Sequence, residues 1–152
     1  MRRMRVIGAA LVVLALATMA GVAIGTPGSG VTAVVVASGT IANPIGIPQA
    51  PGEATWITET TFAPGGTTGW HSHPGKTIVV VKSGTMTLYR SRDGECRVRE
   101  FGPGEGFVER PTSVHIAWNE GDVPLVVGVT YFRIGSNDVV RIDKPDPGVC
   151  AA

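Results

Sequence analysis

The stretch that decides the fold reads PGGTTGWHSHPGKTIVVVKSG and covers residues 64–84. It places His71 and His73 two positions apart, between turn-forming glycines and a β-branched run that ends at Val81. Side chains at positions i and i+2 of a strand point to the same face, so both imidazoles are expected to reach one point. Neutral imidazole is the commonest metal ligand in proteins. The pattern therefore predicts a metal site on the inner face of a sheet.

A second stretch, residues 102–119, supplies the third donor and reads GPGEGFVERPTSVHIAWN. Its His115 lies in a separate predicted strand, and the chain contains 3 histidines in total. One site then accounts for all the histidine of the protein. A lone histidine is more often structural, but three that converge predict a divalent ion such as Zn, Cu, Fe, Mn or Ni.

Short apolar runs separated by turn residues continue on both sides of these stretches. From Ala54 onward, Gly, Pro and Asp turns bound roughly six to eight predicted strands. No stretch shows apolar residues at helical spacing over three turns. The sequence therefore predicts an all-β sandwich or barrel. The run TIVVVK at residues 77–82 is apolar on both faces, which predicts a covered outer face and favours a homodimer.

The composition fits one compact domain with a small-molecule partner. Of the 152 residues, 43% are hydrophobic and 16% are charged. The 13 Lys and Arg residues nearly balance the 12 Asp and Glu residues, which leaves a formal charge of +1. This balance gives no electrostatic basis for binding nucleic acid. A small-molecule ligand is the partner we expect.

The first 25 residues form a segment of a different kind. Arg2, Arg3 and Arg5 precede an uncharged apolar stretch at residues 6–24, which has the shape of an export signal with cleavage near Ala20 or Ala23. The alternative is membrane attachment through residues 6–24, since the run approaches the roughly 20 residues needed to cross a bilayer. Either way the domain is expected outside the cytoplasm, as a secreted, periplasmic or cell-envelope protein.

The rest of the chain divides into a linker and N-terminal strand at 26–55, a barrel at 56–133 and a C-terminal tail at 134–152. It contains two cysteines, Cys96 and Cys150. In an oxidising compartment such a pair favours a disulfide, and the wide separation argues against a zinc site built on closely spaced cysteines. Two free thiols are the alternative.

The two histidine stretches together resemble the paired motifs of the cupin superfamily. The matching positions are Gly65, His71, His73 and Gly84 in the first motif and Gly104 or Gly106, Pro111, His115 and Asn119 in the second. The resemblance covers roughly Thr58 to Arg133. It implies a double-stranded β-helix, the jelly-roll cupin barrel, with a divalent metal ion on His71, His73 and His115.

Thr77 stands where the first cupin motif has a glutamate. Because a threonine hydroxyl is a poor metal ligand, we expect three neutral ligands that leave the ion its full charge and open positions for other ligands. Some cupin enzymes, the thiol dioxygenases among them, likewise use three histidines without the glutamate. Thr77, Glu109 and Asn119 are candidates for supporting the ligands or for contacting a substrate.

Two functional hypotheses follow from the predicted site. The first is a metal-dependent oxygenase, lyase or isomerase that acts on a small molecule. Such an enzyme needs a general acid or base, for which Glu105, Glu109, Tyr89 and Tyr131 are the candidates. The second is a non-catalytic module that binds or senses a small molecule or a metal. The fold alone does not separate the two.

Overall fold

The computed structural model describes residues 25–40, 50, 52–135 and 139–151. The predicted export segment lies outside the described residues except for Gly25. Within these ranges the regular structure consists of strands. None of the described segments is a helix long and apolar enough to cross a membrane.

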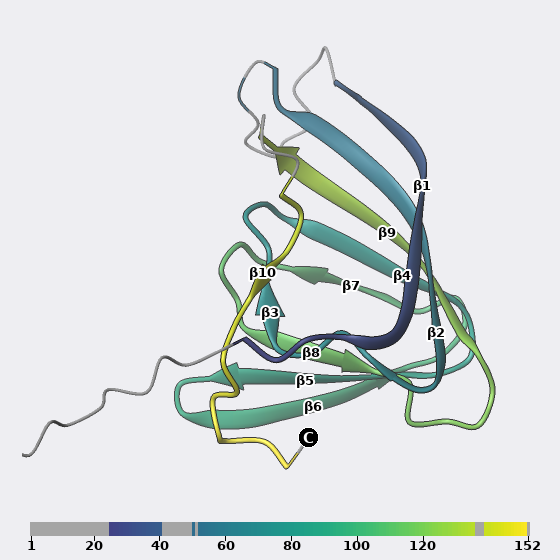
Figure 1. The fold of residues 1–152 in the computed structure, drawn as a ribbon, viewed down its shortest axis with the longest axis vertical. Helices are drawn as coiled ribbons and strands as arrows, with labels where there is room; N and C mark the ends of the chain where they lie inside the picture. The colour runs from purple at the N-terminus through teal and green to yellow at the C-terminus, as the bar shows by residue number, and fades with distance from the viewer. Residues whose placement is uncertain (1–24, 41–49, 51, 136–138, 152) are drawn as a thin grey trace, which may run out of the picture.

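Ten strands make up the described fold (Figure 1). They are β1 (Ser29–Thr40), β2 (Ala54–Thr67), β3 (His71–Ser72), β4 (Thr77–Ser83), β5 (Met86–Arg92), β6 (Glu95–Phe101), β7 (Gly106–Glu109), β8 (His115–Trp118), β9 (Leu125–Ile134) and β10 (Ile142–Asp143). Most connections are short and rich in Gly, Pro or Asp, as the sequence predicts.

All strand pairs are antiparallel, and the sheet curls into a nearly closed barrel (Figure 1). The order along the sheet is β10-β3-β8-β2-β9-β4-β7, with β1 paired to β2, β5 to β8 and β6 to β5. Neighbours in the sheet are mostly distant in sequence, which is the mark of a jelly roll rather than a series of hairpins. The prediction of an all-β jelly-roll barrel is confirmed.

Alternation along β4 shows how the sequence sets the inside of the barrel. Thr77, Val79 and Val81 are buried, whereas Ile78 is half-buried and Val80 is 44% exposed. The two faces of this strand therefore differ in burial although both are apolar, and the outward face is open within a single chain. A homodimer that covers this face stays a prediction.

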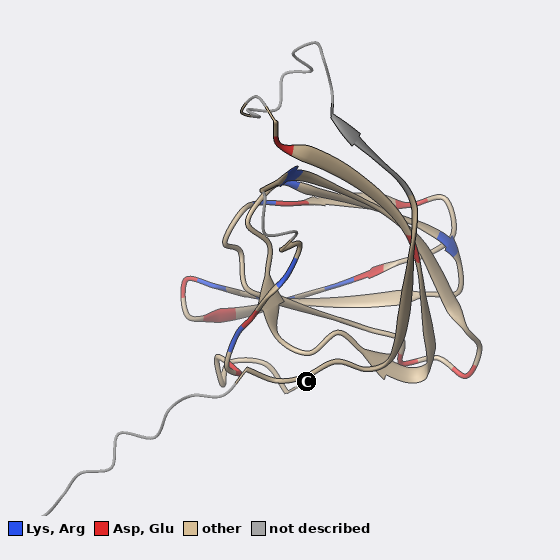
Figure 2. Ribbon diagram, turned by 45° about the horizontal axis from the view of Figure 1, so that its top comes forward, with Lys and Arg blue, Asp and Glu red and all other residues tan. Residues whose placement is uncertain are grey.

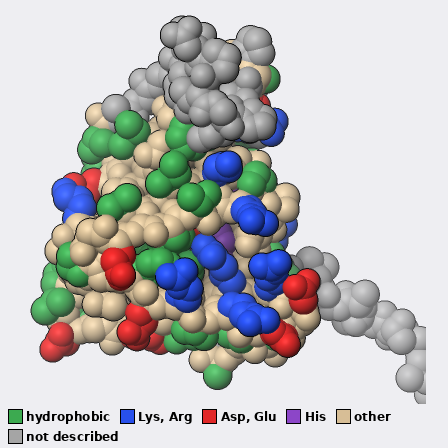
Figure 3. Space-filling model, turned by 180° about the vertical axis from the view of Figure 1, so that it is seen from behind, with side chains coloured by type: hydrophobic (Ala, Val, Ile, Leu, Met, Phe, Trp, Pro, Cys, Tyr) green, Lys and Arg blue, Asp and Glu red, His purple; other side chains and the backbone are tan. Residues whose placement is uncertain are grey.

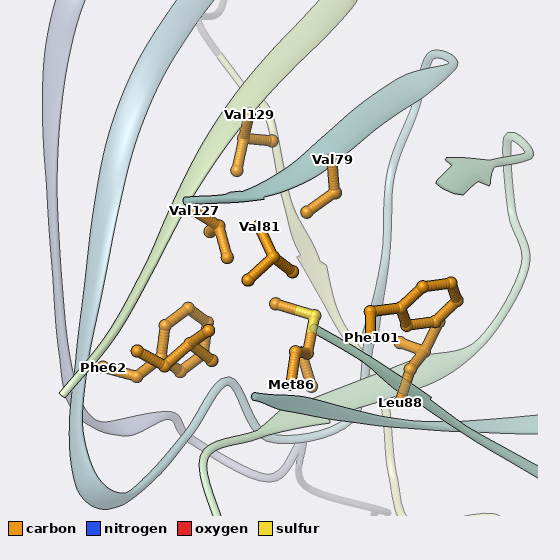
Figure 4. Close-up of a cluster of buried hydrophobic side chains, with 10 residues drawn as sticks. Phe62, Val79, Val81, Met86, Leu88, Phe101, Val127 and Val129 are labelled. Atoms are coloured by element: carbon orange, nitrogen blue, oxygen red, sulfur yellow. The ribbon is translucent and has the colours of Figure 1, made fainter. Parts of the chain in front are cut away.

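The inward residues of one end of the barrel form an apolar core (Figure 4). It consists of Phe62, Val79, Val81, Met86, Leu88, Phe101, Ala117, Leu125, Val127 and Val129. These side chains come from β2, β4, β5, β6, β8 and β9 and point toward one another. Burial of this much apolar surface is the main stabilising contribution to the fold.

A disulfide fastens the C-terminal tail to the barrel. Cys96 on β6 is bonded to Cys150, 54 residues later in the chain, with a Cα–Cα distance of 5.1 Å. The tail therefore runs back across the sheet, where β10 pairs with β3. Charged residues of both signs are scattered over the strands and loops of the barrel (Figure 2).

Candidate metal centre

The fold brings the three histidines together at the end of the barrel opposite the apolar core. His71 on β3 pairs directly with His115 on β8, and His73 follows β3. The ring centroids lie 4.3 Å apart for His71 and His115, 4.8 Å for His71 and His73, and 5.2 Å for His73 and His115. One nitrogen from each ring falls within 4.8 Å of the other two. The predicted convergence of the three imidazoles is confirmed.

Two glycines allow the chain to pass close to its neighbours on either side of the His-x-His pair. A Cβ on Gly69, whose φ is +67°, would lie 2.1 Å from the carbonyl oxygen of Thr26. A Cβ on Gly75 would lie 1.8 Å from the carbonyl oxygen of Phe132. Because no side chain fits at these distances, glycine is required at both positions to keep His71 and His73 in place.

Backbone carbonyls fix the orientation of all three imidazoles. The Nδ1 atoms of His71, His73 and His115 lie 2.9, 2.6 and 2.9 Å from the carbonyl oxygens of Gly69, Val140 and Ser113. A carbonyl oxygen only accepts, so each Nδ1 carries the proton and donates. In the neutral ring the lone pair then resides on Nε2. This second layer of hydrogen bonds is the arrangement that metal-binding histidines use.

Glu109 on β7 brings a carboxylate into the same cluster. Its Oε2 lies 2.9 Å from Nε2 of His73, and its Oε1 lies 2.8 Å from Nε2 of His115. The side chain is 95% shielded from solvent. Burial by itself would raise the pKa of Glu109, but the contacts with His115 and His73 outweigh it and hold the pKa below its usual value. A carboxylate thus lies beside the three neutral donors that the sequence predicts.

Strand pairing explains how the carboxylate reaches the histidines. Thr77 on β4 stands directly opposite Glu109 on β7 and opposite Tyr131 on β9. Paired residues of antiparallel strands share a face. The first cupin motif has a carboxylate at the position of Thr77, and here Glu109 supplies one from the neighbouring strand. The signal in the sequence was the alternation of Phe107 and Glu109, which puts both on the inner face. The Oγ1 atom of Thr77 is buried without a hydrogen-bond partner.

Burial keeps the imidazole of His71 uncharged. Desolvation, followed by the charges of His115 and His73, lowers the pKa of His71 to about 2. This imidazole is therefore neutral at physiological pH and has a lone pair available for a ligand bond. The Nε2 atom of His115 is also buried, and Oε1 of Glu109 lies 2.8 Å from it.

Asn119 does not join the histidines. Its side-chain amide donates to the carbonyl oxygens of Phe62, Ala63 and Val123, and its Oδ1 accepts from the backbone N–H of Gly121. It lies four residues beyond His115 along an extended chain, or about 13 Å away. Its amide holds a loop to the barrel, and a role of Asn119 in supporting the ligands or contacting a substrate stays a prediction.

Of the acid–base candidates, Glu109 and Tyr131 alone reach the cavity beside the histidines. This cavity measures about 50 Å³, and its polar lining includes His71, His73, Glu109 and Tyr131. Burial, and then the charge of Glu109, raises the pKa of Tyr131 to about 12. Tyr89 instead donates to Glu120, and Glu105 accepts from the backbone of Gly102, both at exposed positions.

Comparison with known proteins shows which domain the chain resembles. Residues 58–131 match the family model of the cupin domain, and no curated protein matches the chain. A cupin superfamily protein from Desulfitobacterium hafniense is similar in structure, with a TM-score of 0.52, 12% identity, and coverage of 72% of this chain and 83% of its own.

Part of the chain also matches two larger proteins. An oxalate decarboxylase from Lactobacillus farciminis has a TM-score of 0.50 at 22% identity, over 59% of this chain and 26% of its own. A recombinant oxalate oxidase in complex with glycolate has a TM-score of 0.46 at 27% identity, over 52% and 41%. The present chain spans less than half the length of either. Its residues 58–131 are similar to the cupin domain.

Proposed function

We propose that the protein binds one divalent transition-metal ion through Nε2 of His71, His73 and His115, with the carboxylate of Glu109 as a fourth donor. The observation that carries this proposal is the set of three Nδ1 atoms bonded to backbone carbonyls. Because these bonds leave the Nε2 lone pairs directed into one buried cluster, the imidazoles are ready to coordinate before any ion arrives.

The electrostatics of the cluster also support a bound cation. The carboxylate oxygens of Glu109 lie 2.9 and 2.8 Å from the Nε2 atoms of His73 and His115, and each pair needs a proton or a metal ion to hold it together. Two acceptors this close repel each other unless a cation lies beside them. A metal ion would bind the Glu109 carboxylate and the Nε2 atoms of His73 and His115 together.

The donor set favours a borderline metal over a hard one. Three imidazoles suit Zn, Cu, Fe and Ni, while the single carboxylate also admits Mn. When bound, such an ion polarises a carbonyl or carboxylate, or activates water or dioxygen. Outside the cell, intrinsic affinity would favour Zn or Cu over Fe and Mn.

We further propose that the ion faces a small molecule in the adjoining cavity. Phe107, Met86 and Val129 would enclose the apolar part of such a molecule. Tyr131 would donate a hydrogen bond, because a hydroxyl whose pKa is about 12 stays protonated at neutral pH. In an oxygenase, lyase or isomerase, this hydroxyl would orient the substrate, and Glu109 would be the nearby proton acceptor whenever it leaves the ion.

A specific observation also favours a non-catalytic binding module. Among the described residues that line the cavity, Tyr131 is the one titratable group besides His71, His73 and Glu109. A site with so few groups for moving protons would suffice for capturing a ligand on a metal. Turnover of small carbonyl compounds by the metal-loaded protein would decide for an enzyme.

Metal content of purified protein tests the proposal. His73→Ala should lose at least about nine-tenths of the bound metal, since loss of one of four donors typically weakens a site by orders of magnitude. Tyr131→Phe is the matched control, because it changes the same cavity without removing a donor. Equal metal content in the wild type and His73→Ala, with both folded, would refute metal binding at this site.

We also propose that the domain works outside the cytoplasm. The Cys96–Cys150 disulfide supports this, because such bonds persist in oxidising compartments. Intact-mass measurement on protein from its own host should find a chain that begins near Ala20 or Ala23, or an anchored chain that retains residues 6–24. A full-length chain in the cytosol with two free thiols would contradict export.

A further inference from the structure

The inward face of β5 carries an arginine into the end of the barrel that holds the histidines. Met86 and Leu88 belong to the apolar core, and Arg90 is the next residue on the same face. Arg90 pairs with His115 of β8. Their Cβ atoms are therefore about 5 Å apart on the shared face. A half-buried guanidinium thus adjoins the histidine cluster.

Aromatic rings hold this guanidinium and a second one in place. The Arg90 guanidinium lies over the ring of Phe107, 5.5 Å from its centroid, and the Arg99 guanidinium lies 4.7 Å from that of Phe101. The two phenylalanine rings are themselves 4.4 Å apart. Phe107 lines the cavity beside the histidines. Stacking of this kind fixes the plane of a guanidinium and leaves its N–H groups at the edge available.

Three arginines near Phe107 form no ion pair among the described residues. Within the described part of the chain, Lys82, Arg92, Arg97, Arg133 and Arg141 each form an ion pair, but Arg90, Arg99 and Arg110 form none. Arg90 makes one weak hydrogen bond, from Nη2 to the carbonyl oxygen of Val108 at 3.4 Å. Burial lowers the pKa of Arg90, the charge of Glu109 raises it, and the charges of Arg99 and Arg110 lower it. Three arginines beside the single carboxylate of Glu109 leave a net positive charge that attracts a further anion, the more so when a metal ion engages Glu109.

Basic side chains gather on the face of the molecule where histidine reaches the surface. Figure 3 shows Lys and Arg side chains gathered on one face, around a small patch of histidine surface. Since all three histidines of the chain belong to the buried cluster, that patch marks where the cluster meets solvent. The approach to the proposed metal is therefore lined with positive charge.

We propose that the surface around the histidine patch is a binding site for a small carboxylate anion. Arg90 is the residue that binds this anion directly. A carboxylate matches the planar fork of a guanidinium and accepts two parallel hydrogen bonds from it. Arg99 and Arg110 add attraction and steer the anion toward the histidine patch. The volume of about 50 Å³ beside the histidines limits the ligand to a few heavy atoms.

This inference rests in part on the proposed metal, because the second end of the ligand would point at the ion. Three neutral imidazoles and one carboxylate leave a divalent ion with a net positive charge of one, which also attracts an anion. The arginines are not metal donors, however. Their contribution is therefore measurable with or without metal.

Calorimetric titration with malonate tests the inference, with the neutral analogue malonamide as the ligand control. Zinc-loaded wild type should bind malonate at low ionic strength and bind malonamide at least about tenfold more weakly. Arg90→Gln should weaken malonate binding at least about tenfold, as expected for a lost charge-assisted pair. Arg110→Gln, an exposed change that leaves the core untouched, should weaken it about two- to fivefold through charge alone.

Arg92→Gln is the matched control, since it removes the same charge from the same strand at an arginine paired with Asp93. It should change malonate affinity less than Arg110→Gln does. Equal affinities of wild type, Arg90→Gln and Arg110→Gln, or equal binding of malonamide, would overturn the inference.

Zinc measured in the same samples separates this inference from the proposed function. A wild type that holds zinc but does not bind malonate overturns the inference alone. A wild type without zinc overturns the metal proposal. The inference is then decided by the metal-free protein, in which malonate binding that is lost in Arg90→Gln supports it and binding that is unaffected by this change refutes it.

Discussion

The two ends of the barrel interior are built from the same strands but differ in chemistry. On β4, buried Val81 lies in the apolar core and buried Thr77 lies beside the cluster of donors. On β9, Val127 is a core residue, whereas Tyr131 lines the cavity. Alternation decides which side chains point inward, and position along the strand decides whether they stabilise the fold or serve the site.

This division predicts that changes at the core end cost stability and changes at the other end cost ligand binding. The tail that crosses the sheet is the exception, because it serves both. It is tied to β6 by the disulfide, and its Val140 accepts the Nδ1 hydrogen bond of His73. Its removal or loosening should therefore affect stability and metal affinity together.

Loss of the disulfide should produce the largest effect. The free energy of unfolding of the Cys96→Ser/Cys150→Ser variant should be about 4 kcal/mol lower than that of the wild type. The reason is that the bond closes a loop of 54 residues. Its zinc affinity should also fall, because the acceptor for His73 is no longer anchored. Urea denaturation and zinc competition measure the two quantities. A loss of stability with unchanged zinc affinity would show that the tail does not support the site.

A core change should affect stability alone. Leu88 is 1% exposed and two residues from Arg90 on the same face of β5. Leu88→Ala should lower the free energy of unfolding by about 2–5 kcal/mol, because it removes buried methyl groups and leaves a cavity. The metal content of the folded fraction should stay at the wild-type level. Metal loss at native conditions would mean that the two ends are coupled.

Moving the carboxylate from Glu109 on β7 to position 77 on β4 should show which of the two positions can supply a metal ligand. Thr77→Glu alone should destabilise the protein by roughly 1 kcal/mol, since it places two carboxylates directly opposite each other. Glu109→Gln alone should weaken metal binding about tenfold or more. The double variant should recover much of the affinity, because the carboxylate returns from the neighbouring strand. Failure of the double variant to improve on Glu109→Gln would show that position 77 cannot supply a ligand.

Sequence alone predicted the barrel and the three histidines because both depend on short-range patterns. Alternation, turn residues and the His-x-His spacing fix the inner face without knowledge of which strands pair. The roles of Glu109 and Arg90 depend on the β4–β7 and β5–β8 registers, which bring them opposite Thr77 and His115. No local pattern determines such a register. The bonds of the Asn119 amide to the backbone carbonyls of Phe62, Ala63 and Val123 also depend on the folded chain, so the motif position could not reveal them.

The central claim is that one end of the barrel is a metal centre completed by Glu109. A crystal structure of the zinc-loaded protein, with anomalous data at the zinc edge, tests it most directly. We expect one anomalous peak about 2.0–2.2 Å from Nε2 of His71, His73 and His115 and from a carboxylate oxygen of Glu109. A peak elsewhere, no peak in zinc-loaded protein, or a Glu109 side chain turned away from the ion would contradict it.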